Sequence, residues 1–270
     1  MRIIYALLII AMLFAPHVPF FGAQMAYAAL RTNMSAWYEL NEESGTRVDA
    51  HNSNDLTDNN TVLFGTGIVG NAADFEVDNA NEYLSVADTA DLSITGDGTL
   101  AYWVNRETAA NAYIISKQST NDNISYNSRI INDKPRFAFF TNLSTRSEFT
   151  STSVTIANTG QWYCVVWTWD VSVPSAILYI DSTAVADTED DTSATSIQDS
   201  NATFTVGALD DAGDIINEVD GLIDNVVVVK AIWTQTNVND FCNSGAGISY
   251  ADSAEAAVVP KRPQIINWLN

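Results

Sequence analysis

TFTVGALDDAGDIINEVDGLIDNVVVV, which runs from Thr203 to Val229, is the most informative segment of the sequence about the fold. Residues 203–207 predict a strand that ends at a glycine, and an acidic loop follows at 210–214. Residues 221–229 are rich in β-branched side chains, which is typical of a buried strand. The order of strand, acidic loop and strand points to a β-rich domain.

A short helix is predicted just after this stretch. Either Thr234 or Thr236 is suitable as the residue that caps its beginning, and Gly245 as the residue that stops it. The helix would extend through Phe241. A single short helix near the end of a β-rich chain further limits the folds that this sequence can adopt.

From Met34 onward the chain reads as short strands separated by Asn, Asp, Gly and Ser, without a long helical period. The expected strands lie at residues 35–40, 69–75, 82–86, 99–106, 113–117, 124–131, 136–141, 154–156, 161–170, 176–180, 203–206 and 222–229. Residues 161–170 are apolar on both alternating faces, which predicts a strand in the middle of a sheet. A chain of many short strands is compatible with a β-sandwich or a β-barrel. The sequence contains no repeat of the length of a propeller blade, so it does not support a β-propeller.

Both ends of the chain differ from this pattern. An apolar run at 3–15 follows Arg2, and Ala26-Tyr27-Ala28 offers small residues for cleavage, so residues 1–28 are predicted to be a secretory signal peptide. An uncleaved anchor is the alternative, and no later segment approaches membrane-spanning length. A single domain then occupies residues 29–250. Residues 251–270 form a tail whose apolar end could add a strand, dock on the body or fray.

The chain is strongly acidic, with 12 Lys and Arg, 33 Asp and Glu, and a net charge of −21, or 11 − 33 = −22 without residues 1–28. Such a surface repels nucleic acid and anionic lipid because it lacks clusters of Lys and Arg. His51 is the one histidine left after cleavage. A His-rich zinc site is therefore excluded, and a Ser-His-Asp triad would have to use this residue.

Two cysteines, Cys164 and Cys242, are far apart in the sequence. Secretion permits a disulfide between them, while a small buried side chain is the other interpretation for each. The low count excludes a small domain that is held together mainly by disulfides.

Several motifs occur in an order that resembles one family. AWYELNEESG at 36–45, followed by Asp49, looks like the opening of a laminin-G-like jelly roll, and LAYWV at 100–104 resembles a later strand. GQW at 160–162 and ILYID at 177–181 resemble a hairpin of the same domain, although Ser182 stands where glycine is usual. With the final strands and helix, this order is similar to laminin-G-like and pentraxin-like domains of the concanavalin A-like lectin architecture. The resemblance implies an all-β, antiparallel, two-sheet jelly-roll sandwich with one short C-terminal helix.

Five tryptophans lie within the apolar strands: Trp37, Trp103, Trp162, Trp167 and Trp169. Large rings on two facing sheets fill the gap of about 10 Å between them, so we expect these rings in the core of the sandwich. A platform on which sugars stack is the alternative interpretation.

The resemblance also implies a calcium site. Pentraxin-like domains take ligands from an Asp-Asn pair in one hairpin, from acids after the strand that ends in glycine, and from a polar residue before the last strand. The matching residues are Asp122, Asn123, Asp211 and Asn217. Leu209 stands where a glutamate is expected, so Asp210 or Asp214 would have to replace it. Calcium prefers such adaptable sets of oxygen ligands, while solvated acidic loops are the alternative.

Asp49 and Asp224 have a structural interpretation. Asp49 lies in a polar turn with Asn52 and Asn54, and a second, structural calcium ion could lie between this turn and the strand of Asp224. The favoured expectation is that the Asp224 carboxylate instead accepts hydrogen bonds that tie a loop down.

Glycoside hydrolysis is the enzymatic alternative, because some concanavalin A-like domains are glucanases with a Glu-x-Asp-x-x-Glu strand. EVD occurs at 76–78 and at 218–220, but neither copy is followed by the third acid. A retaining mechanism needs two carboxylates about 5 Å apart. The sequence therefore predicts no catalytic residue, and a glycoside hydrolase or polysaccharide lyase is the third choice.

The composition and the resemblance lead to one functional prediction. We expect a secreted or cell-surface, non-catalytic domain that binds an extracellular glycan or a surface protein through its rim loops, with calcium as the one candidate cofactor. The alternative is a structural or adhesion module of a cell or viral surface that binds no small ligand. A fold by itself does not determine the function.

Overall fold

The computed structural model describes residues 30–77, 81–119, 123–157 and 159–254. These residues belong to one compact unit, Tyr27–Glu255. The predicted signal peptide at 1–28, most of the tail at 251–270 and the candidate ligand Asp122 lie outside the described residues. Within the described part, no helix has the length and the apolar character needed to cross a membrane.

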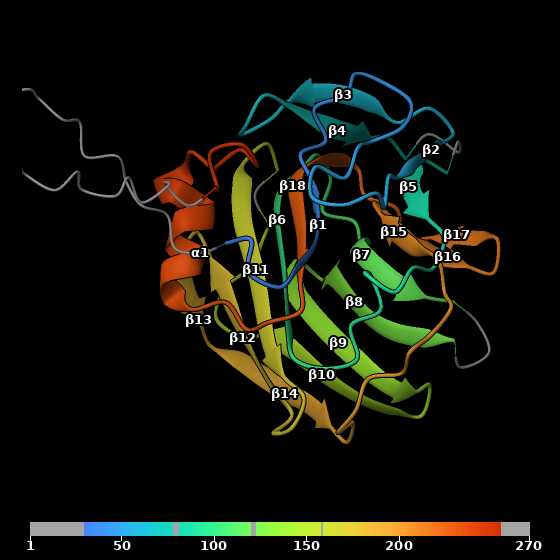
Figure 1. Ribbon diagram of the computed structural model, residues 1–270, viewed down its shortest axis with the longest axis vertical. Helices are drawn as coiled ribbons and strands as arrows, with labels where there is room; N and C mark the ends of the chain where they lie inside the picture. The colour runs from blue at the N-terminus through green and yellow to red at the C-terminus, as the bar shows by residue number, and fades with distance from the viewer. Residues whose placement is uncertain (1–29, 78–80, 120–122, 158, 255–270) are drawn as a thin grey trace, which may run out of the picture. The chain divides into compact units, whose positions relative to one another are not determined.

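Two antiparallel sheets of eight strands each form the body of the domain (Figure 1). The strands of sheet I are, in spatial order, β13 (Thr183–Val185), β12 (Ser175–Ile180), β11 (Trp162–Asp170), β6 (Gly98–Arg106), β18 (Gly221–Val229), β4 (Asn71–Phe75) and β3 (Leu63–Thr66), with β1 (Met34–Tyr38) on β18. Those of sheet II are β14 (Asp187–Thr192), β10 (Thr145–Ser151), β9 (Lys134–Asn142), β8 (Ile124–Ile131), β7 (Ala112–Gln118), β15 (Phe204–Val206), β5 (Tyr83–Val86) and β2 (Thr57–Asn59). A small hairpin, β16 (Leu209–Asp211) with β17 (Asp214–Ile216), lies outside both sheets.

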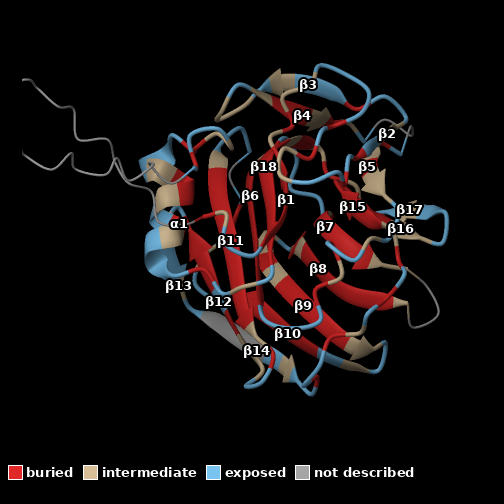
Figure 2. Ribbon diagram, viewed as in Figure 1, coloured by how far each residue is buried: buried red, intermediate tan, exposed pale blue. Residues whose placement is uncertain are grey.

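The space between the two sheets holds the main apolar core. Alternate side chains point into it, such as Tyr102 on β6 and Trp167 and Trp169 on β11 of sheet I, and Phe137 on β9 of sheet II. The rings of Phe137 and Trp169 lie 4.7 Å apart between their centroids. Figure 2 shows that buried residues run along the central strands of both sheets. The structure therefore confirms the predicted all-β, two-sheet sandwich.

The outer side of sheet I carries a second apolar cluster, because the side chains that alternate with the core residues are also large and apolar. Trp37, Trp103 and Cys164 lie in this cluster, together with Phe241 and Cys242 of the helix α1 (Gln235–Cys242). Strands β6, β11 and β18 are therefore buried on both faces, as the apolar character of residues 161–170 predicted.

This second cluster corrects one expectation. Trp37 and Trp103 do not fill the gap between the sheets but lie on the other side of sheet I, under α1. Trp162 is half-buried at the edge of the same cluster. Trp167 and Trp169 do lie in the gap. The reason is the period of two along a strand, which sends neighbouring positions to opposite faces.

The helix α1 begins where the sequence predicted. Thr234 is its cap: the Oγ1 atom accepts a hydrogen bond from Asn237 N at 3.3 Å, and Asn237 Oδ1 accepts one from Thr234 N at 2.9 Å. These two bonds satisfy backbone groups that lack partners at a helix end. The helix stops at Cys242, with Asn243 in the left-handed conformation at φ 42°, and a short 3-10 turn reaches Gly245.

Some strands differ from the expectation. Residues 154–156 form no strand, while β2, β3, β10, β13 and β14 were not predicted. The turn at Asp181 and Ser182 has positive φ at both residues, 49° and 67°, which is the two-residue hairpin geometry that usually favours glycine or asparagine. Polar side chains with little periodicity explain why β10 and β14 were missed, since only their hydrogen-bonded neighbours make them strands.

Candidate functional site

The acidic loop predicted at 210–214 is the hairpin β16–β17, which carries Asp210 and Asp211. Asp210 Oδ1 accepts a hydrogen bond from Gly213 N at 2.7 Å, so this carboxylate stabilises its own turn. Asn217 follows β17 at the base of the hairpin. Its carbonyl oxygen accepts a hydrogen bond from Tyr113 N at 2.8 Å, at the beginning of β7.

Asn123, the remaining described member of the predicted calcium site, lies just before β8. Its Oδ1 accepts a hydrogen bond from Asn201 N at 3.0 Å, and its carbonyl oxygen accepts one from Ser119 N at 2.8 Å. Asn217 thus adjoins the beginning of β7 and Asn123 adjoins its end, and a strand of seven residues spans about 20 Å. The calcium site of Asp122, Asn123, Asp210, Asp211 and Asn217 stays a prediction.

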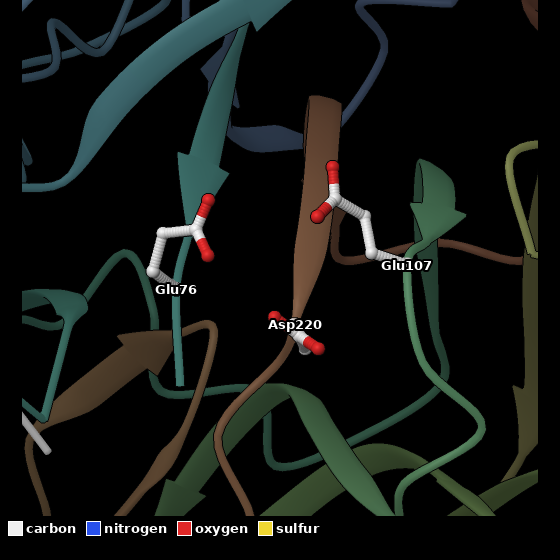
Figure 3. A group of neighbouring side chains, drawn as sticks. All are labelled: Glu76, Glu107 and Asp220. Atoms are coloured by element: carbon white, nitrogen blue, oxygen red, sulfur yellow. The ribbon is translucent and has the colours of Figure 1, made fainter. Parts of the chain in front are cut away.

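Three other carboxylates meet at one end of sheet I. Glu76 follows β4, Glu107 follows β6, and Asp220 precedes β18 (Figure 3). Strands β4 and β6 both run antiparallel to β18, so their ends meet its beginning. Figure 3 shows the side chains of Glu76 and Glu107 directed toward each other from the two sides. The ligand atoms of the three groups all lie within 4.8 Å of one another.

The charges of this group favour a cation. Glu107 is exposed, and Glu76 and Asp220 are half-buried. Burial, with the charge of Asp220, raises the pKa of the neighbouring Asp74. Like charges at this spacing repel one another, and a divalent cation with oxygen ligands relieves that repulsion. The three carboxylates could therefore hold a metal ion.

Sequence reasoning treated Glu76 and Asp220 as parts of two separate EVD motifs and did not consider Glu107. The strand register carries the missing signal. Gly221 pairs with Phe75 on β4 and with Arg106 on β6. The residue after each partner therefore lies beside the residue before Gly221, which brings the three acids together.

The same carboxylates have a spacing close to that of a retaining glycosidase, about 5–5.5 Å. That mechanism also needs a carboxylic acid kept protonated by a pocket that excludes water. Glu107 is exposed, and the other two are only half-buried. The geometry fits cation binding better than acid catalysis.

Asp49 is a buried hydrogen-bond acceptor at the centre of its turn. Its Oδ1 accepts hydrogen bonds from Trp37 N and His51 N, both at 3.0 Å. Its Oδ2 accepts from Asn54 N at 3.3 Å and from Asn54 Nδ2 at 3.0 Å. Both carboxylate oxygens are thus occupied by the turn and by β1.

Asp224 is fully buried on the outer side of sheet I. Its Oδ2 accepts hydrogen bonds from Ile68 N at 2.7 Å and Val69 N at 3.0 Å, while its Oδ1 has no hydrogen-bond partner in the described part of the chain. Desolvation raises its pKa to about 7; the backbone hydrogen bonds oppose this shift, and the charge of Glu39 adds to it. The carboxylate fixes the loop at residues 68–69 through these hydrogen bonds, while its burial costs free energy because the charge loses its hydration.

Cys164 on β11 and Cys242 at the end of α1 form a disulfide. It connects residues 78 positions apart and links the helix to the outer side of sheet I. His51 Nδ1 lies 3.0 Å from Tyr250 Oη, so the single histidine of the described residues contacts a tyrosine next to the C-terminal segment.

Comparisons with known protein families and structures agree with this fold. A profile described as the concanavalin A-like lectin/glucanases superfamily, of the laminin G type, matches residues 78–239, more than half of the chain. A comparison with curated proteins found no match.

Several solved structures share the fold at low sequence identity. The binding domain of Paraclostridial mosquitocidal protein 1 is 12% identical with a TM-score of 0.62, and the alignment covers 80% of this chain and 53% of that one. Domain 4 of AbnA, an extracellular arabinanase from Geobacillus stearothermophilus in complex with arabinotriose, is 13% identical with a TM-score of 0.59, covering 80% and 98%. The binding domain of botulinum neurotoxin DC in complex with SialylT is 13% identical with a TM-score of 0.61, covering 80% and 52%. The chain thus spans about half of the two toxin binding domains.

Proposed function

The chain belongs to the concanavalin A-like lectin/glucanases superfamily, and from this premise we propose that it is a secreted, non-catalytic domain that recognises an extracellular glycan or a surface protein. One observation carries the proposal. The sandwich aligns over 80% of the chain with domains whose structures contain arabinotriose, SialylT or rat synaptotagmin II. Fold likeness alone does not determine a ligand, so the proposal depends on a direct binding test.

The loops at the rim of the sandwich are the proposed contact surface, with calcium as an aid. The group of Glu76, Glu107 and Asp220 offers the oxygen ligands that calcium prefers. Asp210 and Asp211 on the β16–β17 hairpin remain the other candidate ligands. The disulfide between Cys164 and Cys242 supports a location outside the cytosol, where disulfides persist.

The first experiment measures binding of the full chain to a panel of polysaccharides and glycoproteins, including arabinan oligosaccharides and sialylated oligosaccharides, with and without calcium. We expect at least one glycan or glycoprotein to bind, with no release of reducing ends. No binding across the panel, together with a defined oligomer by light scattering, would favour the structural or adhesion module. Release of sugars from any polymer would favour the enzyme.

Calcium is tested separately by thermal unfolding. A ligand that binds only the folded state raises the melting temperature, so millimolar calcium should raise it and a chelator should reverse the change. Glu107→Gln and Asp211→Ala then identify the site, since only the variant that removes a ligand loses the response. An unfolding curve that neither calcium nor chelator moves contradicts the metal but leaves glycan recognition open.

A further inference from the structure

The basic residues of this acidic chain are unevenly distributed. The chain holds 12 Lys and Arg against 33 Asp and Glu. Three of the bases are fully buried, namely Arg47, Arg106 and Lys117. Four others lie on three adjacent strands of sheet II: Arg129 on β8, Lys134 and Arg136 on β9, and Arg146 on β10.

The strand period sends the side chains of all four residues to the outer side of sheet II. Tyr126 on β8 and Phe137 on β9 point into the core between the sheets, so Arg129 and Arg136, which lie an odd number of positions away, point outward. Arg129 and Arg136 are direct partners in the β8–β9 register. The helix α1 packs on sheet I and does not cover this face (Figure 1).

Glu148 on β10 lies at the centre of the arginines. Its Oε2 is 2.9 Å from Arg129 Nη2 and 3.2 Å from Arg146 Nε, and its Oε1 is 3.0 Å from Arg136 Nη1. Three guanidinium groups therefore share one carboxylate. The Glu148 side chain is 6% exposed, and those of Arg129, Arg136 and Arg146 are 13%, 28% and 45% exposed, so the network reaches solvent mainly through Arg136 and Arg146. We call Arg129, Arg136, Arg146 and Glu148 the arginine cluster.

The arginine cluster keeps unused donors. Arg136 Nε is buried and has no hydrogen-bond partner among the described residues. Each guanidinium has five N–H donors, and the carboxylate of Glu148 has two oxygens for all three groups. Like charges directly opposite one another on a sheet destabilise it, and a second anion between Arg129 and Arg136 would relieve that repulsion.

Two acids on the neighbouring edge strand β14, Asp190 and Asp191, accept hydrogen bonds from hydroxyl side chains. Asp190 on β14 accepts a hydrogen bond from Thr150 Oγ1, and Asp191 accepts from Ser193 N at 2.9 Å and from Ser193 Oγ at 2.5 Å. Asp191 is close enough to Arg146 for that charge to help lower its pKa, although the bonds from Ser193 contribute more. These acids form one border of the arginine cluster.

An aromatic ring forms the opposite border. The Cζ atom of Arg129 lies 5.7 Å from the centroid of the Tyr113 ring on β7. Arg129 Nη1 also donates to Asn127 Oδ1 at 2.7 Å, which orients the guanidinium. An aromatic face beside fixed polar groups suits the apolar face of a sugar ring with its hydroxyls.

We propose that the arginine cluster binds the oxyanion of an acidic glycan, either the carboxylate of a uronic-type sugar or a sulfate ester, with Tyr113 under the sugar ring. This inference rests on the proposed glycan recognition and names the class of glycan. Planar guanidinium groups match the two oxygens of such an anion in a fork geometry. The site is on the outer face of sheet II and is separate from the acidic rim groups.

The test compares three sugars with the same ring: galacturonate, galactose 6-sulfate and galactose. Each is titrated into the full chain labelled with nitrogen-15, and the Nε–H signals of the arginines are followed by NMR. We expect one or both anionic sugars to shift the signals of Arg136 and Arg146, with galactose binding at least about tenfold more weakly, since hydrogen bonds between charged groups are worth that factor. The comparison of the first two sugars separates carboxylate from sulfate.

Matched variants assign the effect to the arginine cluster. Arg146→Gln should weaken binding of the anionic sugar about tenfold. Lys230→Gln removes the same charge from an exposed residue that donates to Ala90 O, and it should leave the affinity unchanged. Equal losses in both variants would mean general electrostatics and would overturn the site.

Glu148→Gln distinguishes a binding site from a structural network. It removes the internal competitor for the arginines, so the affinity for the anionic sugar should rise severalfold while the melting temperature falls. A fall in the melting temperature without a gain in affinity would overturn the proposal.

Failure of this inference and of the proposed function can be told apart. Binding of a neutral glycan, with no binding of the two acidic sugars, overturns the acidic class alone. Failure of the three sugars and of the whole glycan and glycoprotein panel overturns both.

Discussion

The outer faces of the two sheets have the same strand geometry, but they differ in the side chains that they carry and in what covers those side chains. On sheet I the outward residues are apolar, such as Trp37, Trp103 and Val166, and α1 covers them. On sheet II the outward side chains of β8, β9 and β10 are mixed. Arg129, Arg136 and Glu148 are in contact with one another, and a small buried apolar cluster consists of Ile124, Ala138 and Phe140. The side chains at the outward positions therefore determine whether the face of a sheet becomes a second apolar core, as on sheet I, or carries a charged network, as on sheet II.

Each face also contains one buried carboxylate, in opposite surroundings. Asp224 on sheet I accepts hydrogen bonds from Ile68 N and Val69 N, and within the described residues it forms no ion pair and its Oδ1 has no hydrogen-bond partner. Glu148 on sheet II forms ion pairs with three guanidinium groups. A buried charge without a counter-charge is costly, whereas a well-paired one is tolerated.

The largest expected change in stability comes from the outer face of sheet I, which α1 covers. Replacing both Cys164 and Cys242 by alanine removes a cross-link over 78 residues and should lower the free energy of unfolding by about 4.5 kcal/mol, from the loop entropy of the unfolded chain. Equilibrium denaturation in urea measures this change. A reduced wild-type chain is the control and should match the variant.

A loss below about 1 kcal/mol in both samples would contradict this expectation. It would mean that the packing of Trp37 and Phe241, whose rings lie 5.9 Å apart, holds α1 on sheet I without the disulfide. The covered face would then behave as an ordinary apolar core.

The next effect is on the pH dependence of stability. The pKa of Asp224 is raised to about 7 in the folded state, against about 4 for an exposed aspartate. Between these values the folded state keeps a proton that the unfolded state has released, so stability falls as the pH rises, by roughly 3 to 4 kcal/mol across the window. Below pH 4 both states are protonated and above pH 7 both are ionised, so no further change comes from this group.

Asp224→Asn isolates this contribution, because the amide keeps an acceptor for Ile68 N and Val69 N and does not ionise. The stability difference between variant and wild type should rise from pH 4 to pH 7 in favour of the variant. Thermal unfolding over a series of buffers measures it. Parallel curves for the two proteins would refute an unpaired carboxylate on this face.

The smallest effect is expected on the open face. Arg146→Gln breaks an ion pair that is 45% exposed on the arginine side, and such pairs are worth less than about 1 kcal/mol. We expect unfolding free energies within about 0.5 kcal/mol of wild type, by the same urea measurement. A much larger loss would mean that the arginine cluster is a structural element rather than an open surface.

The central strands could be predicted because their residues match the local signal. Residues 161–170 and 222–229 are apolar on both faces, and the structure places β11 and β18 in the middle of sheet I. The helix cap at Thr234 could be predicted for the same reason, since capping depends on neighbours within one turn. The edge strand β14, which carries Asp190 and Asp191, could not be predicted, because pairing with β10 is what makes it a strand.

The candidate sites could not be predicted from the sequence for the same reason as the edge strand. Glu76, Glu107 and Asp220 come from three strands whose register brings them within 4.8 Å. Arg136 and Glu148 are brought together by the β9–β10 pairing. Spacing along the chain carries no information about such contacts. A full set of strand partners is needed before they can be predicted.

The amino-acid sequence was sufficient to predict the class of this protein, an acidic, all-β sandwich with one late helix and apolar central strands, because these features depend on composition and on periodicity along the chain. The folded structure was needed to establish which tryptophans lie between the sheets, which carboxylates meet at the end of sheet I, and which arginines contact Glu148. Those choices depend on strand register and on what covers each face, and both are set by contacts between residues that are distant in the chain.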